Sequence, residues 1–597
     1  MSFTIEFQPI GQRLIAEEAL TVLSAARQAG LRLRADCGGE GTCGKCHVRF
    51  VGAPPDLPVH PSDRRHLTDR QLANGYRLAC SAVVDRSTQI FIPSDSLPGG
   101  QVLQTASDES EVVPDPLIRQ RSLQLQPAAL GDLRADFERL QEIIGRRLNA
   151  GLETLKEIPQ VLRGNAWQVN LILEGERLQY VTAKSVVPLA GLAVDVGSTK
   201  LACYLIDLES GQRLAVKGLP NPQIIYGEDI MARLAYAQKG AGQAQELHDL
   251  LAQSIQQALE NLCAQCGLNP GQVADVCLVG NTAMHHFTLG LPTGGLAVSP
   301  FVPAVSAALQ TPGGQIGLRG MPGMHTYTPP VIAGFVGSDH LAFLLACGFG
   351  TDQRVRLGID IGTNTEIALQ KGERILSVST ASGPAFEGAH IRFGMRAAPG
   401  AIEHVHLDEG HFTCEIIADA PASGICGSGI LDALGELRAG GLLNSRGRLD
   451  KSHPLVKLDA QGKPFVTLAA GAEAQRPITL SQADIDQVLL AKGAIRAGID
   501  VLMDALRVQP EEIEEIVIAG AFGSYMLPDQ AIRIGMLPGV PLERIRAVGN
   551  AAGLGAQMML VSQSARRQAE ALAAHIQYLE LTLYPDFEIF YANGIRA

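Results

Sequence analysis

The sequence predicts a multidomain α/β protein: a small mixed β-sheet domain, a small α+β middle domain and a large two-lobed α/β domain. Three observations lead to this prediction. The chain has 597 residues, which is too long for one hydrophobic core and enough for roughly three or four domains. Four cysteines gather near the N-terminus, and one strand–glycine–hydroxyl pattern occurs twice in the C-terminal two thirds. The composition, 46% hydrophobic and 18% charged, is ordinary for globular α/β chains.

The net charge and the chain start limit the possible partners and location. A net charge of −12 argues against nucleic acid, because phosphate backbones are bound by clustered Lys and Arg. The N-terminus lacks a basic stretch followed by an apolar run, so no secretory signal is expected. The most apolar window, 331–350, contains Ser338, Asp339 and His340, which are costly in a bilayer. We therefore expect a cytoplasmic protein with no membrane span, whose cysteines are metal-ligand candidates rather than disulfides.

Apolar periodicity divides the chain into four parts. Residues 1–93 contain strands near 2–7 and 47–51 and a helix near 20–29. Residues 94–128 are rich in Pro, Ser, Asp and Gln, as is typical of a linker. In 129–188, a helical pattern over 130–148 and a hairpin turning at 174–176 predict the middle domain. Residues 189–597 form the two-lobed domain.

A cysteine cluster in the first part is a candidate redox centre. Cys37, Cys43 and Cys46 have C-x5-C-x2-C spacing, and Cys80 lies 34 positions after Cys46. Four thiolates can hold a [2Fe-2S] cluster with one pair on each iron, and plant-type ferredoxins use C-x4-C-x2-C plus a distant cysteine. The extra residue makes this spacing similar to that of vertebrate-type ferredoxins. We predict a β-grasp ferredoxin domain with these four cysteines as metal ligands.

The glycines between the cysteines support the iron–sulfur interpretation. Gly38, Gly39, Gly41 and Gly44 lack a Cβ, so the backbone can wrap the sulfurs and point N–H groups at them. A zinc site with the same four ligands is the alternative. Zinc knuckles usually supply two C-x2-C pairs, whereas this cluster contains one.

Two loops in the large domain are candidate phosphate-binding sites. In 192–200 and again in 357–365, an apolar strand carries an Asp near its end, followed two positions later by Gly and then hydroxyl residues. Such a turn exposes N–H groups to phosphate, and the Asp can hold Mg²⁺ directly or through water. The two aspartates, Asp195 and Asp360, are the predicted catalytic residues. The predicted nucleotide-binding residues are Gly197, Ser198, Thr199, Lys200, Gly362, Thr363 and Asn364.

A third glycine turn, 516–523, again follows an apolar strand and fits a loop close to adenosine, with Gly520 and Gly523 as candidate contacts. Together the three loops resemble the phosphate-1, phosphate-2 and adenosine motifs of the actin, sugar kinase and heat-shock chaperone ATPases. The resemblance implies a two-lobed, actin-like ATPase domain that binds ATP and Mg²⁺.

The family resemblance is closer still. Over nearly the whole chain, the sequence resembles the reductive activators of corrinoid proteins. The resemblance rests on the N-terminal domain and on the segments 280–286 (GNTAMHH), 382–388 (SGPAFEG) and 424–429 (GICGSG). This resemblance implies a homodimer that takes an electron from a low-potential donor, which the sequence does not identify. It implies delivery of that electron to the Co(II) of a corrinoid protein or corrinoid methyltransferase subunit, restoring Co(I) with ATP hydrolysis.

Two other functions are alternatives. A ferredoxin-domain oxidoreductase would need a flavin or nicotinamide site, and the sequence has no strand–turn–helix G-x-G-x-x-G. A nucleotide-gated, redox-sensing binding module would bind ATP without turning it over. A second C-x2-C pair is Cys263 and Cys266. Related dehydratase activators bridge a [4Fe-4S] cluster across a dimer with two cysteines per subunit, but those cysteines lie much further apart in sequence. Core packing is therefore the favoured interpretation, since buried cysteines are common.

Overall fold

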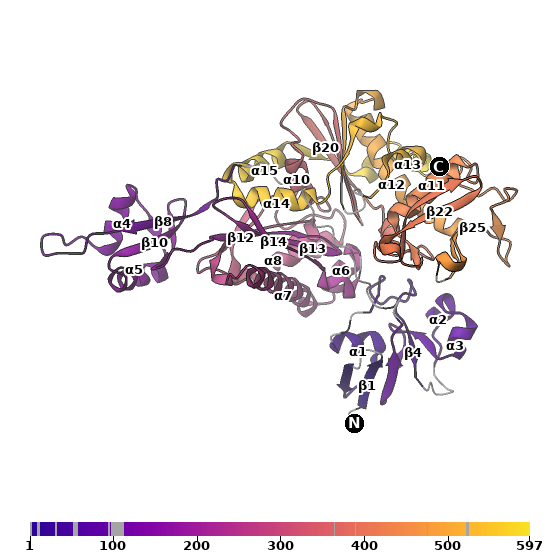
Figure 1. The fold of residues 1–597 in the computed structure, drawn as a ribbon, viewed down its shortest axis with the longest axis horizontal. Coiled ribbons are helices and arrows are strands. Elements are labelled where there is room, and N and C mark those ends of the chain that lie inside the picture. The colour runs from indigo at the N-terminus through magenta and orange to yellow at the C-terminus, as the bar shows by residue number, and fades with distance from the viewer. Residues whose placement is uncertain are drawn as a thin grey trace.

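The computed structural model describes residues 3–8, 12–29, 31, 33–51, 58–93, 96, 113–227, 229–362, 364–388, 390–474, 476–520 and 525–596. Two predicted loop residues, Thr363 and Gly523, lie outside the described residues. Figure 1 shows the N-terminal domain below a large two-lobed body and the middle domain at the far end of the long axis. No helix within these ranges is both long and apolar enough to cross a lipid bilayer.

The N-terminal domain is a five-stranded mixed sheet, ordered β2-β1-β7-β4-β5, with helix α1 packed on it. Alternation builds the first strand, since Phe3, Ile5 and Phe7 are buried and Thr4 is exposed. Helix α1 begins after Thr21, whose hydroxyl accepts a hydrogen bond from the Ser24 N–H at 3.1 Å. Its elements are β1 (Phe3–Gln8), β2 (Gln12–Ala16), β3 (Leu20–Thr21), α1 (Val22–Gln28), β4 (His47–Phe50), α2 (Pro61–His66), α3 (Asp69–Ala73), β5 (Tyr76–Leu78), β6 (Val83–Val84) and β7 (Thr88–Phe91).

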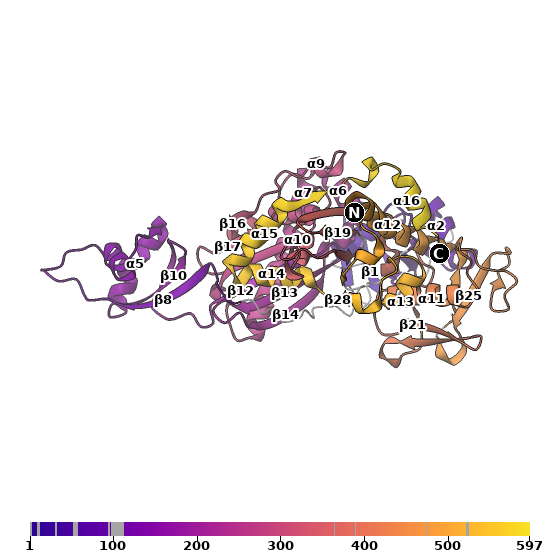
Figure 2. The ribbon, with the colours of Figure 1, turned by 90° about the horizontal axis from the view of Figure 1, so that it is seen from above.

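The middle domain is a four-stranded sheet, ordered β8-β10-β11-β9, with two helices. Both views place it at one end of the molecule, extending from the body (Figure 2). The predicted hairpin is confirmed, because β10 and β11 pair antiparallel up to Glu174 and Arg177. The elements are β8 (Ile118–Gln124), α4 (Asp136–Ile144), β9 (Asn149–Ala150), α5 (Leu152–Gly164), β10 (Gln168–Glu174) and β11 (Arg177–Thr182).

Two predictions for this region are corrected. The segment Ile118–Gln124 is not linker: it is strand β8 and pairs along its whole length with β10. It is an edge strand whose residues between Ile118 and Leu125 are mostly exposed, so its place in the sheet rests on backbone hydrogen bonds rather than apolar periodicity. The helix expected over 130–148 is shorter. It ends at Gly145, which adopts φ 75°.

The two lobes of the large domain repeat one topology. Lobe 1 has the order β14-β13-β12-β15-β17-β16, and lobe 2 has β28-β27-β18-β19-β20-β29. In each lobe a central strand pairs antiparallel with the next strand and parallel with a later one. This duplication, with the N-terminal and middle domains, confirms the predicted multidomain α/β fold class.

Lobe 1 consists of β12 (Ala190–Val196), β13 (Lys200–Asp207), β14 (Arg213–Pro220), η2 (Pro222–Tyr226), α6 (Ile230–Ala237), α7 (Ala241–Gln265), β15 (Val273–Gly280), α8 (Thr282–Leu289), α9 (Gly294–Ala297), β16 (Leu309–Pro312) and β17 (His325–Thr328). Lobe 2 has β18 (Arg356–Ile361), β19 (Thr365–Lys371), β20 (Arg374–Thr380), α12 (Gln482–Leu506), β27 (Glu515–Ala519), α13 (Pro528–Arg533), β28 (Ile545–Ala547), β29 (Ile576–Tyr578) and α16 (Phe587–Gly594). A subdomain inserted in lobe 2 carries β21 (Ala401–Asp408), β22 (His411–Ile416), β23 (Gly424–Ile425), α11 (Gly427–Ala439), β24 (Lys457–Leu458), β25 (Pro464–Ala469) and β26 (Ile478–Ser481).

Helices α10 (Ser338–Ala346), α14 (Ala551–Val561) and α15 (Gln563–His575) join the lobes. One continuous core contains Phe343 of α10 and Leu560 of α14 together with strand residues of both sheets. The two helices approach closely at Gly555, where a Cβ would lie 2.1 Å from the Ala342 carbonyl oxygen. Glycine is therefore required there for α10 and α14 to pack this closely.

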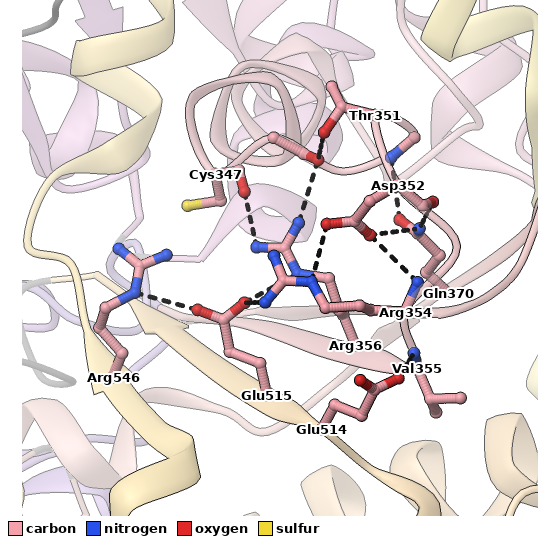
Figure 3. A network of polar contacts seen from close by, with 12 residues as sticks. Cys347, Thr351, Asp352, Arg354, Val355, Arg356, Gln370, Glu514, Glu515 and Arg546 are labelled. Carbon is pink, nitrogen blue, oxygen red and sulfur yellow. Dashed lines mark hydrogen bonds and ion pairs between the residues drawn. The ribbon is translucent and has the colours of Figure 1, made fainter.

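A buried ion-pair network holds the end of α10 against lobe 2 (Figure 3). The Arg356 side chain, 2% exposed, donates to the carbonyls of Cys347 and Gly348 at 2.7 and 3.0 Å and to Glu515 at 2.8 Å. Arg546 donates to the other Glu515 oxygen at 3.1 Å. Against the effect of burial, these arginines hold the pKa of Glu515 below its usual value. Arg356 thus caps the helix that joins the lobes.

Replacing Arg356 by Ala should lower the free energy of unfolding by about 3 kcal/mol, because it removes a buried charge partner of Glu515 and the donor to the Cys347 and Gly348 carbonyls. Arg354→Ala is the matched control. Arg354 also pairs with Glu515, at 3.4 Å, but its side chain is 47% exposed, so we expect a loss below about 1 kcal/mol. Denaturant unfolding measures both, and equal losses would contradict the role given to Arg356.

Candidate functional site

The four predicted cluster cysteines come together in the loop before β4 and the turn after β5, as two sulfur pairs. The Cys43 thiol donates a hydrogen bond to Cys37, and together with backbone N–H groups this lowers the pKa of Cys37 to about 3, against the effect of burial. The same hydrogen bond and burial raise the pKa of Cys43. In the second pair, the hydrogen bond from Cys46 lowers the pKa of Cys80 and raises that of Cys46.

The backbone around these sulfurs has the shape that a cluster needs. All four loop glycines have positive φ, from 67° to 107°, and a Cβ at Gly44 would lie 2.8 Å from the His66 side chain. Within the described parts of the chain, no three His, Cys, Asp or Glu side chains converge as ligands of one metal ion. Two separate thiol pairs fit a binuclear centre with one pair on each iron better than they fit a single tetrahedral zinc.

The second site is a pocket between the lobes. It brings together most of the residues predicted for nucleotide and Mg²⁺ binding: Asp195, Gly197, Ser198, Thr199, Lys200, Asp360, Gly362, Asn364 and Gly520. Asp195 and Asp360 occupy equivalent positions near the ends of β12 and β18, because the two lobes repeat one topology. Gly520 adopts φ 92°, and a Cβ there would lie 2.4 Å from the Ile361 carbonyl oxygen. The loop after β27 therefore lies directly beside the second phosphate loop.

Four carboxyl groups line this pocket. Burial raises the pKa of Asp195 to about 6, and burial plus the charge of Asp195 raises that of Asp360 to about 7. Burial and both of these charges raise the pKa of Asp339 to about 8. Burial and the charges of Asp339 and Asp360 raise the pKa of Glu366 well above its usual value. A cluster of repelling carboxylates fits a divalent cation, which Mg²⁺ sites typically hold through one or two carboxylates and several waters.

Several pocket residues were not predicted from the sequence. Asp339 stands in the first turn of α10, and Asn550 caps α14 and donates to Asp195 at 2.9 Å. Asn281 caps α8 and donates to the Ser198 hydroxyl at 2.8 Å. These residues lie at helix N-termini that tertiary packing brings to the pocket. The only sequence signal was indirect, since Asn281 belongs to the GNTAMHH segment.

The remaining C-x2-C pair lies elsewhere. Cys263 is buried in the core of lobe 1, and the Cys266 thiol donates to the Leu214 carbonyl at 3.7 Å. Core packing therefore accounts for both residues.

Comparison with known proteins identifies the family. Four family models match in order: a 2Fe-2S iron-sulfur cluster binding domain (5–85), the RACo linker region (107–186), the RACo middle region (190–352) and the C-terminal domain of RACo, the ASKHA domain (354–596). Corrinoid activation enzyme RamQ of Eubacterium limosum is 30% identical over 589 residues, covering 96% of this chain and 95% of its own. The chain belongs to the RACo family of reductive activators.

Two further relatives agree with this assignment. The solved structure of a reductive activator for corrinoid, iron-sulfur protein superposes with a TM-score of 0.74 at 30% identity, covering 100% of this chain and 98% of that chain. A [Co(II) methylated amine-specific corrinoid protein] reductase of Methanosarcina barkeri is 26% identical over 405 residues, or 62% of this chain and 70% of its own. The chain thus contains the iron–sulfur and ASKHA domains of the family.

Purified protein should contain about two irons per chain and give a rhombic electron paramagnetic resonance signal after reduction, as a four-thiolate [2Fe-2S] centre does. Cys43→Ser should lose the signal. Cys266→Ser, which removes another partly exposed thiol, should keep it. Stoichiometric zinc without iron in the wild type would contradict this assignment.

Proposed function

We propose that this chain is an ATP-dependent reductive activator that passes an electron from a [2Fe-2S] cluster to the Co(II) corrinoid of a partner protein, restoring Co(I). The observation that carries the proposal is the presence, in one chain, of a ferredoxin-type cysteine loop and a two-lobed pocket lined by repeated phosphate loops. The names of its relatives, a corrinoid activation enzyme and a Co(II) corrinoid protein reductase, support the same function.

The chain's own residues have distinct roles in this proposal. Cys37, Cys43, Cys46 and Cys80 hold the cluster, which supplies a one-electron donor when bound. The turns at Gly197 and Gly362 present N–H groups and hydroxyls to the phosphates of ATP. Asp195 and Asp360 orient Mg²⁺ and its waters from opposite lobes. Asn550 holds Asp195 in place through the 2.9 Å hydrogen bond.

ATP is needed because Co(I) is a strong reductant. A one-electron step uphill by roughly 200 mV costs about 5 kcal/mol, at 59 mV per tenfold. A nucleotide can help only by favouring a state of the complex in which the acceptor is easier to reduce. It shifts the equilibrium between two states no further than the difference in its affinity for them. The two lobes around one pocket supply an element that can close on ATP and open after hydrolysis.

The partners follow from this function. We propose a corrinoid protein or corrinoid methyltransferase subunit as the acceptor, a low-potential one-electron donor, and a homodimer as the active form. An oxidoreductase would form Co(I) without ATP. A redox-sensing module would bind ATP without turnover.

Asp195→Asn and Asp360→Asn should each lower ATP turnover by about 100-fold, on the scale of losing one well-placed electrostatic group. The iron content and the cluster spectrum should stay unchanged, because the cysteines lie in another domain. Asp249→Asn, which changes an exposed carboxylate of α7 in lobe 1, is the matched control. Wild-type turnover in both pocket variants would show that these loops do not serve hydrolysis.

Variants that inactivate one domain at a time test the coupling between the cluster and ATP hydrolysis. Cys43→Ser should keep ATP turnover stimulated by the corrinoid partner yet form no Co(I), because no cluster delivers the electron. Asp360→Asn should accept an electron at its cluster and fail at the uphill transfer. Absorbance of Co(II) and Co(I), with reductant and candidate corrinoid proteins, follows both. Equally fast Co(I) formation without ATP would replace the proposal by a simple electron carrier.

A further inference from the structure

One short segment of lobe 1 touches both the phosphate loop and the N-terminal domain. It runs from Asn221 through the 3-10 helix η2 to Gly227. Figure 1 shows the N-terminal domain next to the end of lobe 1 that carries α6, the helix that follows this segment. The segment itself does not line the nucleotide pocket.

The first end of the segment is tied to the phosphate loop. Asn221 is fully buried. Its backbone N–H donates to the Thr199 carbonyl at 2.9 Å, and its side-chain amide donates to the Gly197 carbonyl at 2.8 Å. Its side-chain oxygen accepts from the Gln223 N–H at 2.9 Å, which starts η2. A movement of the phosphate loop therefore moves the start of η2.

The other end of the segment receives the N-terminal domain. The Arg27 guanidinium of α1 donates to the Ile225 carbonyl and lies 5.0 Å from the centre of the Tyr226 ring. The cluster loop touches the same place: a Cβ on Gly38 would lie 2.9 Å from the Tyr226 carbonyl oxygen. At position 38 of the cluster loop, only glycine fits against the Tyr226 carbonyl.

Neighbouring residues of lobe 1 fix the position of the Tyr226 ring. The hydroxyls of Tyr226 and Tyr236 both donate to Glu246, the second at 2.7 Å, and the two rings lie 4.4 Å apart. Two aromatic faces and a carboxylate form a site suited to a cation. At the end of the segment, the buried Arg233 donates to the Gly227 carbonyl at 2.7 Å, so the segment is anchored on both sides of the contact.

We propose that Tyr226, Tyr236 and Glu246 form a docking surface for the chain's own N-terminal domain, with Arg27 as the positioning residue, and that Asn221 links docking to the phosphate loop. Docking covers the Gly38 side of the cluster loop, so an acceptor reaches that side only after release. Electron transfer from that side then requires that ATP weaken docking. This inference rests on the proposed function, since it says how nucleotide binding reaches the redox domain.

Reciprocity gives the first test. If ATP weakens docking, loss of docking must strengthen nucleotide binding by the same factor. Arg27→Ala in the full chain should bind a non-hydrolysable ATP analogue about tenfold more tightly, within the usual range of coupling between sites. Arg27→Lys, which keeps the charge but loses the planar contact, should give a smaller gain. Arg13→Ala, an exposed arginine whose ion-pair partner Glu6 lies in its own domain, should bind as the wild type does.

Hydrogen exchange gives the second test, independent of catalysis. In the wild type the analogue should speed exchange of the 224–227 and α1 amides about tenfold. Arg27→Ala should show the fast rate with and without the analogue. Asn221→Ala should bind the analogue and show no change at α1. Unchanged wild-type exchange at both segments, or wild-type affinity in Arg27→Ala, would overturn the proposal.

The two proposals fail in different ways. If the wild type forms Co(I) with ATP while exchange at 224–227 ignores the analogue, the docking proposal is wrong and the proposed function stands. If exchange responds as described and Co(I) never forms, the proposed function is wrong and the docking surface stands.

Discussion

The interlobe pocket depends on one electrostatic constraint: four carboxyl groups, of which Glu366 is buried and the other three are half-buried, line it together. Asp195 and Asp360 come from the equivalent strands of the two lobes, while Asp339 and Glu366 come from α10 and β19. Burial raises the pKa of all four, and the charges of neighbouring carboxylates add to this at Asp360, Asp339 and Glu366. Such a cluster opposes closure of the lobes unless positive charge enters. In the proposed function, closure of the lobes is therefore tied to the binding of a cation with the nucleotide.

Helix α10 links the pocket to other parts of the large domain. Its first turn carries Asp339, its middle packs against α14 at Gly555, and the carbonyl of its C-cap Cys347 accepts from Arg356. Because a helix in a close-packed core moves as a unit, it cannot adjust to the pocket at one end alone. Helix α10 therefore connects the pocket, through Asp339, with the ion pairs around Glu515 in lobe 2.

Local patterns predicted the parts of the molecule that local geometry determines. The duplicated strand–glycine–hydroxyl segments predicted the two lobes and placed Asp195 and Asp360, and cysteine spacing placed the thiol pairs. Asp339 and Asn550 could not be predicted, because packing of α10 and α14 brings them to the pocket and nothing nearby in sequence marks them. Strand β8 was missed for a related reason, since an exposed edge strand needs backbone partners and little apolar periodicity.

The described contacts between the redox domain and lobe 1 are few, as the proposed release requires. One arginine on a tyrosine face and a backbone carbonyl, together with one glycine against another carbonyl, give a modest free energy, small enough for nucleotide binding to outweigh it in the proposed mechanism. The chain also re-enters the body at Asp115, whose backbone pairs with Val561 and Gln563 at 2.9 Å. A domain tethered in this way stays at a high local concentration even with a weak contact. A larger apolar interface would hold the domain on lobe 1 in every nucleotide state. With the small polar contact, the free energy of ATP binding is enough for the proposed release.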